Sequence, residues 1–123
     1  MGLKTFEENS EKKFIYSGKK LVIPKNVKTI GYQSFMNNDT LTHVFIEPNS
    51  ILTTISQEAF KESILRYFEF INTIETISSG SFYNCKLDIR NYNRSDDNEY
   101  VINMPTNLLT IGKNAFNNSF DEV

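Results

Sequence analysis

The stretch LVIPKNVKTIGYQSF, residues 21–35, contains the pattern on which the fold depends. Its last nine residues recur three more times, always as an aliphatic residue, an Ile three positions later, and Ser-Phe or Ala-Phe four and five positions after that Ile. The four segments are VKTIGYQSF (27–35), LTTISQEAF (52–60), IETISSGSF (74–82) and LLTIGKNAF (108–116). Self-similarity at a period of about 20 to 50 residues is typical of solenoids, in which each repeat stacks on the next.

A short apolar alternation precedes each segment, as expected of a strand with one buried face. The alternating pairs are Leu21/Ile23, Val44/Ile46, Phe68/Phe70 and Ile102/Met104. Because a single unit of this size cannot cover its own apolar side, neighbouring units must stack. We therefore expect a solenoid of short parallel strands joined by short helical turns, with the repeated Phe residues in the core.

This arrangement resembles the BspA-type leucine-rich repeat, whose family pattern runs L-x-I-P-x-x-V-x-x-I-G-x-x-A-F-x-x-C. Cys85 stands at the final cysteine of that pattern, whereas Ser56 and Ser78 replace the glycine and Ile71 replaces the proline. The resemblance covers about residues 14–120. It implies a right-handed leucine-rich-repeat solenoid, often displayed on the surfaces of bacteria and parasitic protists, where members bind host matrix or other proteins.

The domain organisation follows from the spacing of the repeats. We expect an N-terminal cap at residues 1–20 and one solenoid domain at 21–120, with repeats at 21–41, 42–64, 65–87 and 88–120. The first three repeated Phe residues are 25 and 22 positions apart, but the third and fourth are 34 apart. The surplus is a polar insert at residues 88–99, which is expected to loop out of the solenoid.

Composition and charge argue against several classes of partner. The 13 basic and 15 acidic residues are spread along the chain, so there is no basic stripe for a nucleic acid. No uninterrupted apolar run approaches the ~20 residues that span a bilayer, so membrane insertion is not expected. The start of the chain has no apolar stretch of signal-peptide length. Localisation stays open, because the resemblance points to surface display whereas the lack of a signal peptide favours an intracellular product or a truncated gene.

Few residues suggest chemistry. His43, the only histidine, has no nucleophile tied to it by a motif, and Cys85 reads as a small buried hydrophobe. Asp96, Asp97 and Glu99 could hold calcium, but the glycine-bearing calcium loop is absent and charged loops are usually only solvated. We therefore expect no catalytic residue, no metal site, no cofactor and no enzyme activity.

Strand parity predicts a binding surface. If the alternating pairs above point inward, the residues between and beside them form a ladder on the opposite, outer face of the sheet. Exposed aromatic residues such as Phe45 and Tyr67 often anchor protein interfaces, although they could instead pack on each other or against the N-terminal segment. The predicted partner-binding residues are Val22, His43, Phe45, Tyr67, Glu69 and Asn103.

The expected function is a non-catalytic protein–protein interaction module, either ligand-binding or adhesion-like, whose protein partner is unidentified. The alternative is a structural or self-assembling fragment of a longer repeat array, which would associate through its solenoid ends because no polar terminal cap follows Phe116. Three Asn-x-Ser/Thr sequons, at Asn38, Asn93 and Asn117, would matter only in a secreted protein.

Overall fold

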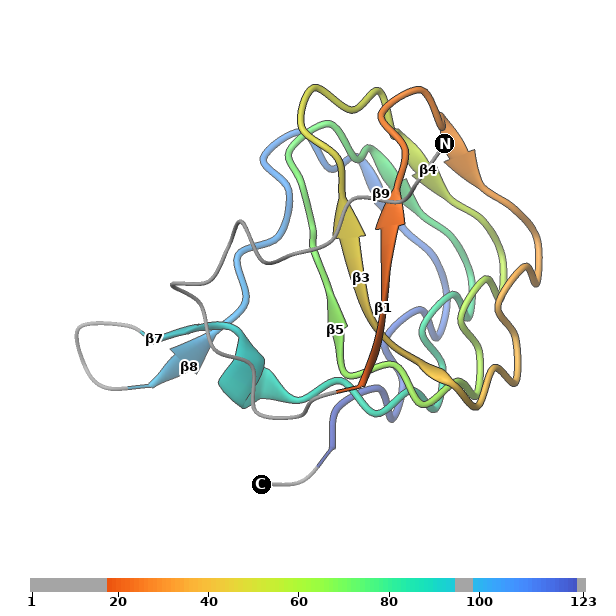
Figure 1. Ribbon diagram of the computed structural model, residues 1–123, viewed down its shortest axis with the longest axis vertical. Coiled ribbons are helices and arrows are strands. Elements are labelled where there is room, and N and C mark those ends of the chain that lie inside the picture. Colours follow the sequence, from red (N-terminus) through yellow and green to blue (C-terminus); the bar gives the residue numbers. More distant parts are fainter. Residues whose placement is uncertain (1–17, 95–98, 122–123) are drawn as a thin grey trace.

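The computed structural model describes residues 18–94 and 99–121, and it forms a stack of similar coils (Figure 1). One sheet contains the parallel strands β1 (Lys19–Ile23), β3 (Leu41–Ile46) and β5 (Tyr67–Phe68), in that order. The other contains the parallel strands β2 (Thr29–Ile30), β4 (Thr54–Ile55), β6 (Thr76–Ile77) and β9 (Thr110–Ile111). The predicted solenoid of short parallel strands is confirmed.

The second sheet contains the repeated Ile residues of the sequence pattern, each preceded by a Thr. Its rungs are identical in type, because Thr29, Thr54, Thr76 and Thr110 lie side by side in register, and so do the Ile residues that follow them. In the two middle strands the Ile side chains are fully buried, whereas the Thr side chains are partly exposed. The two middle strands therefore each present one face to the core, as a period of two requires.

The Ser/Ala-Phe motif lies in hydrogen-bonded turns and not in regular helix. The reason is that the residue two before each Phe has a positive φ, which interrupts helical geometry. These residues are Gln33 (53°), Glu58 (58°), Gly80 (63°) and Asn114 (63°). The turns form a third ladder of backbone hydrogen bonds: Phe35 N donates to Ala59 O at 2.7 Å, Phe60 N to Ser81 O at 2.7 Å and Phe82 N to Ala115 O at 2.9 Å.

The repeated Phe side chains form a continuous stack through the core. The ring centroids of Phe35 and Phe60 are 5.1 Å apart, those of Phe60 and Phe82 are 5.4 Å apart, and those of Phe82 and Phe116 are 5.3 Å apart. Phe60 and Phe82, in the interior repeats, are completely buried. The Phe positions of the sequence pattern are therefore core positions.

Cys85 has a structural place in this core. Its Sγ donates to the backbone oxygen of Phe60 at 2.9 Å, and the equivalent Ser119 hydroxyl donates to the oxygen of Phe82 at 2.7 Å. Burial raises the pKa of the Cys85 thiol to about 11, so the thiol stays protonated near neutral pH. This position thus links the third coil to the second and the fourth coil to the third.

The fourth strand expected at Ile102/Met104 is not formed, and that prediction was wrong. Strand β8 (Tyr100–Val101) lies just before these residues and pairs antiparallel with β7 (Asn93–Arg94). The reason is that the Tyr92 hydroxyl occupies the free edge of β5, where it accepts from Phe68 N and donates to Phe68 O, each at 3.0 Å. The Tyr92 side chain therefore takes the place beside β5 that a fourth strand would have occupied.

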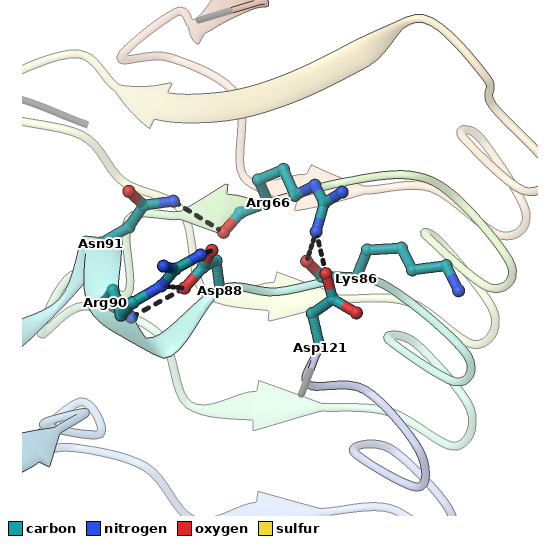
Figure 2. A network of polar contacts seen from close by, with 6 residues as sticks. All are labelled: Arg66, Lys86, Asp88, Arg90, Asn91 and Asp121. Carbon is teal, nitrogen blue, oxygen red and sulfur yellow. Dashed lines mark hydrogen bonds and ion pairs between the residues drawn. The ribbon is translucent and has the colours of Figure 1, made fainter. Parts of the chain in front are cut away.

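The expectation that the insert loops out was also wrong for its first residues. Asp88 and Asn91 are buried, and the insert begins with the 3₁₀ helix η2 (Ile89–Asn91). Figure 2 shows two of its attachments: the Asp88 carboxylate accepts from Arg90, with the closest contact at 2.7 Å, and the Asn91 amide donates to the oxygen of Arg66. The backbone nitrogen of Asp88 also donates to that oxygen, at 3.0 Å. In Figure 1, the β7–β8 pair projects away from the stacked coils.

Candidate functional site

The outer face of the three-stranded sheet is the predicted binding surface, and the structure corrects its description. Val22, His43 and Phe45 are 5%, 0% and 3% exposed, so the expectation that they face solvent was wrong. The parity itself holds, because Ile23, Val44, Ile46 and Phe68 belong to the main hydrophobic cluster, whereas these three are buried outside it. Strand β3 is therefore buried on both faces.

Large neighbouring side chains on this face cover one another. Val22 lies beside Phe45 in the parallel register, and the Phe45 ring lies 5.4 Å from that of Tyr67. His43 contacts both rings, at 6.3 and 6.4 Å between centroids. Tyr92 extends the cluster from the insert, 4.9 Å from Tyr67. Parallel strands about 4.8 Å apart bring side chains of this size into contact, which leaves the middle of the face closed.

Tyr67, Glu69 and Asn103 lie at the part of this face that remains accessible. Tyr67 and Glu69 are half-buried and Asn103 is exposed. All three line one small pocket, of about 190 Å³, between the edge of the sheet and the residues around the insert. We call it the outer-face pocket, and its lining residues are Tyr67, Glu69, Phe70, Asn72, Tyr92, Asn93, Ile102 and Asn103.

Glu69 has one oxygen committed to the fold and one that is not. Its Oε1 accepts from the backbone nitrogen of Ile46 at 2.9 Å, which satisfies a donor at the end of β3. No other hydrogen bond or ion pair reaches this carboxylate from residues 18–94 and 99–121. Burial raises the pKa of the Glu69 carboxyl, and the Ile46 N–H offsets this only in part. The pocket therefore has an acidic group whose charge is not neutralised by a neighbouring cation.

The contacts and the burial of His43 are those of a structural residue. The Thr42 hydroxyl lies 2.8 Å from its Nδ1, and burial, with Lys20 and Arg66 nearby, lowers its pKa to about 4. It is therefore neutral near pH 7. Its side chain is fully buried beside the rings of Phe45 and Tyr67, which are the surroundings of a structural side chain.

No group of three or more His, Cys, Asp or Glu side chains is placed to hold a metal ion within the part of the chain that the structure describes. Asp96 and Asp97, two members of the acidic cluster considered for calcium, lie outside the described residues, as do residues 1–17 of the cap expected at 1–20. The described residues also include no helix of the length and apolarity needed to cross a bilayer.

A second, larger hollow of about 410 Å³ lies along the turn ladder. Its charged groups are already partnered in part: Glu58 accepts from Gln33 at 2.7 Å and pairs with Lys61 at 3.3 Å, and Lys61 lies 5.7 Å from the centre of the Tyr83 ring. The sequence pattern did not point to this groove. The sequence pattern also did not point to Tyr92, which stood out only as an aromatic residue within a polar insert.

Comparison with known families places the chain among leucine-rich repeats. The family described as BspA type leucine rich repeat region (6 copies) matches residues 3–88, more than half of the chain. The chain belongs to this family. The match ends where the insert begins, but β9 continues the second sheet beyond it, so the fourth repeat of the sequence pattern is part of the stack. No curated protein and no solved structure matches the chain.

Family membership defines the general class of protein. Leucine-rich repeats are generally non-enzymatic, and they form interaction or repeat modules. Ligand choice in such proteins depends on surface residues and not on the repeat framework. The specific role of this chain must therefore be argued from its accessible surfaces.

Proposed function

We propose that the chain is a non-catalytic protein-binding module and that its binding site is the outer-face pocket. The observation that supports this most is that the pocket combines aromatic lining with a carboxylate oxygen that has no partner among the described residues. Tyr67 and Tyr92 offer aromatic surface, Glu69 has a carboxylate oxygen without a partner among the described residues, and Asn103 adds an exposed amide. Protein interfaces are enriched in tyrosine, which provides large contact area at low entropic cost.

A displayed library of random peptides tests this proposal. Peptides enriched on the intact chain are expected to bind an Asn103→Arg variant at least about tenfold more weakly, because a bulky cation would block the pocket. Lys113→Glu, which changes a charge in the groove of the turn ladder, is the matched control and should leave binding unchanged. Enriched peptides that bind Asn103→Arg as well as the natural chain would place the site elsewhere.

A specific observation also favours the second candidate, a self-assembling unit. In the turn ladder, backbone nitrogens of each repeat donate to oxygens of the next. At the last repeat the nitrogens of Asn114, Phe116 and Asn118 have no acceptor among the described residues, and at the first repeat the oxygens of Tyr32, Ser34 and Met36 have no donor there. A second copy stacked head to tail would satisfy both sets, and such stacking is open-ended.

The exposed side chains at β9 fit this second candidate. Leu109 is 79% exposed and Ile111 is 52% exposed, both at the free edge of the second sheet. Sedimentation equilibrium over a wide concentration range should then show association by the natural chain but not by Ile111→Arg. A monomer at every concentration would exclude self-assembly without affecting the first proposal.

A further inference from the structure

We infer that the outer-face pocket binds a cationic side chain, a lysine ammonium or an arginine guanidinium, presented by the partner. This inference rests on the proposed function, because it names the chemistry that the same pocket would recognise. It depends on four pocket residues: Glu69, Tyr67, Phe70 and Tyr92.

The position of the Glu69 carboxylate is fixed by the fold. Oε1 is held by the backbone N–H of Ile46 at 2.9 Å, so the side chain is oriented before any ligand arrives. The remaining oxygen is free to accept from a ligand. A carboxylate that is half-buried and unpaired is destabilised by the loss of water, and an approaching cation relieves that cost with a charge-assisted hydrogen bond.

The aromatic rings beside Glu69 also favour a cation. The rings of Tyr67 and Tyr92 are 4.9 Å apart, and Phe70 lies 6.4 Å from Tyr92, so the three form a continuous wall. The negative face of an aromatic ring attracts a lysine or arginine group. Burial, together with the nearby Glu69 carboxylate, raises the pKa of the Tyr67 phenol, so the charge and the ring lie in the same small space.

Among the described residues, no cationic side chain lines the pocket. The described lining residues include one acidic residue and no basic one, and the other polar groups are the phenols of Tyr67 and Tyr92 and the amides of Asn72, Asn93 and Asn103. The three ion pairs among the described residues involve other acids, namely Glu58, Asp88 and Asp121. An anionic ligand would meet uncompensated repulsion here, whereas a neutral one would leave the carboxylate unpaired.

Titration of the isotope-labelled chain with small probes, followed by NMR, tests the inference. The probes are N-acetyl-lysine methylamide, N-acetyl-arginine methylamide and the neutral N-acetyl-norleucine methylamide. We expect a saturable shift of the Ile46 amide signal with the lysine or the arginine probe, because that amide is bonded to Glu69. Norleucine should bind at least about tenfold more weakly, since it lacks the charge-assisted hydrogen bond.

Glu69→Gln is the matched variant. A glutamine keeps an oxygen that can accept from Ile46 but removes the charge, so the fold should survive while affinity for the cationic probes falls about tenfold. Equal shifts with norleucine and lysine on the natural chain would overturn the inference, even if the variant failed to fold. Peptides that bind independently of Glu69 would also overturn it but leave the proposed function standing. Cationic probes that bind while peptide selection fails would support the cation-binding pocket but overturn the proposed peptide-binding function.

Discussion

The hydroxyl group of Tyr92 lies 3.0 Å from both the backbone nitrogen and the backbone oxygen of Phe68. Phe68 is the last residue of β5, the edge strand of the three-stranded sheet, and its side chain is fully buried. An unprotected sheet edge tends to pair with other chains. One tyrosine from the insert therefore closes an edge that the next repeat of a regular solenoid would cover.

Tyr92→Phe tests that relationship. The substitution keeps the ring but removes both hydrogen bonds to Phe68, and we expect the free energy of unfolding to fall by about 1 to 3 kcal/mol. Chemical denaturation measures the change. Tyr32→Phe, at a ring that is 62% exposed, is the control and should have almost no effect. Equal stability of the two variants would show that the edge is closed by other means.

Phe60→Ala tests the aromatic stack. The Phe60 ring is fully buried between Phe35 and Phe82, so its loss should cost about 3 to 5 kcal/mol of stability. That is a large part of the about 5 to 15 kcal/mol that stabilises a typical domain. A thermal melt would show the loss directly. A melting temperature like that of the natural chain would mean that the stack is not the core.

His43 predicts a dependence of stability on pH. Its pKa is about 4 in the folded chain and 6.5 without the surrounding protein, so the unfolded chain binds the proton more tightly. The contribution of His43 is complete above pH 6.5 and falls as the pH is lowered toward 4, by about 3 kcal/mol in all. Because it is the only histidine, NMR titration of its ring reports the pKa without ambiguity. A value near 6.5 would contradict its burial.

Cys85 should be unreactive in the native chain. Its thiol is buried, donates to Phe60 O and has a pKa raised to about 11, so little thiolate forms near neutral pH. Ellman's reagent should label it slowly in buffer and rapidly in denaturant. Rapid labelling of the folded chain would indicate that this part of the core opens.

The repeat framework could be predicted from the sequence because it depends on local patterns. The positions of Ile30, Ile55, Ile77 and Ile111 followed from spacing alone, and the structure places them in one register. What could not be predicted were contacts between distant segments that lack a periodic signal. Tyr92 and Phe68 are 24 residues apart, and nothing in a polar insert reveals that its tyrosine returns to the sheet.

The candidate site shows the same limit. Parity correctly separated the two faces of β3, but it could not show that the outer face is closed at Val22, His43 and Phe45, because exposure depends on what packs above a strand. Tyr67, Glu69 and Asn103 remain at an accessible pocket because they lie where the regular stacking of the first sheet ends. The outer-face pocket is thus formed where the insert interrupts the regular repeats.

The most direct measurement of the proposed site is the NMR footprint of a selected peptide on the labelled chain. Binding at the outer-face pocket should shift the amide signals of Ile46, Glu69 and Asn103 and leave those of Glu58, Lys61 and Lys113 in the turn ladder unchanged. The reverse pattern, with shifts along the turn ladder and none around Glu69, would contradict the proposed site.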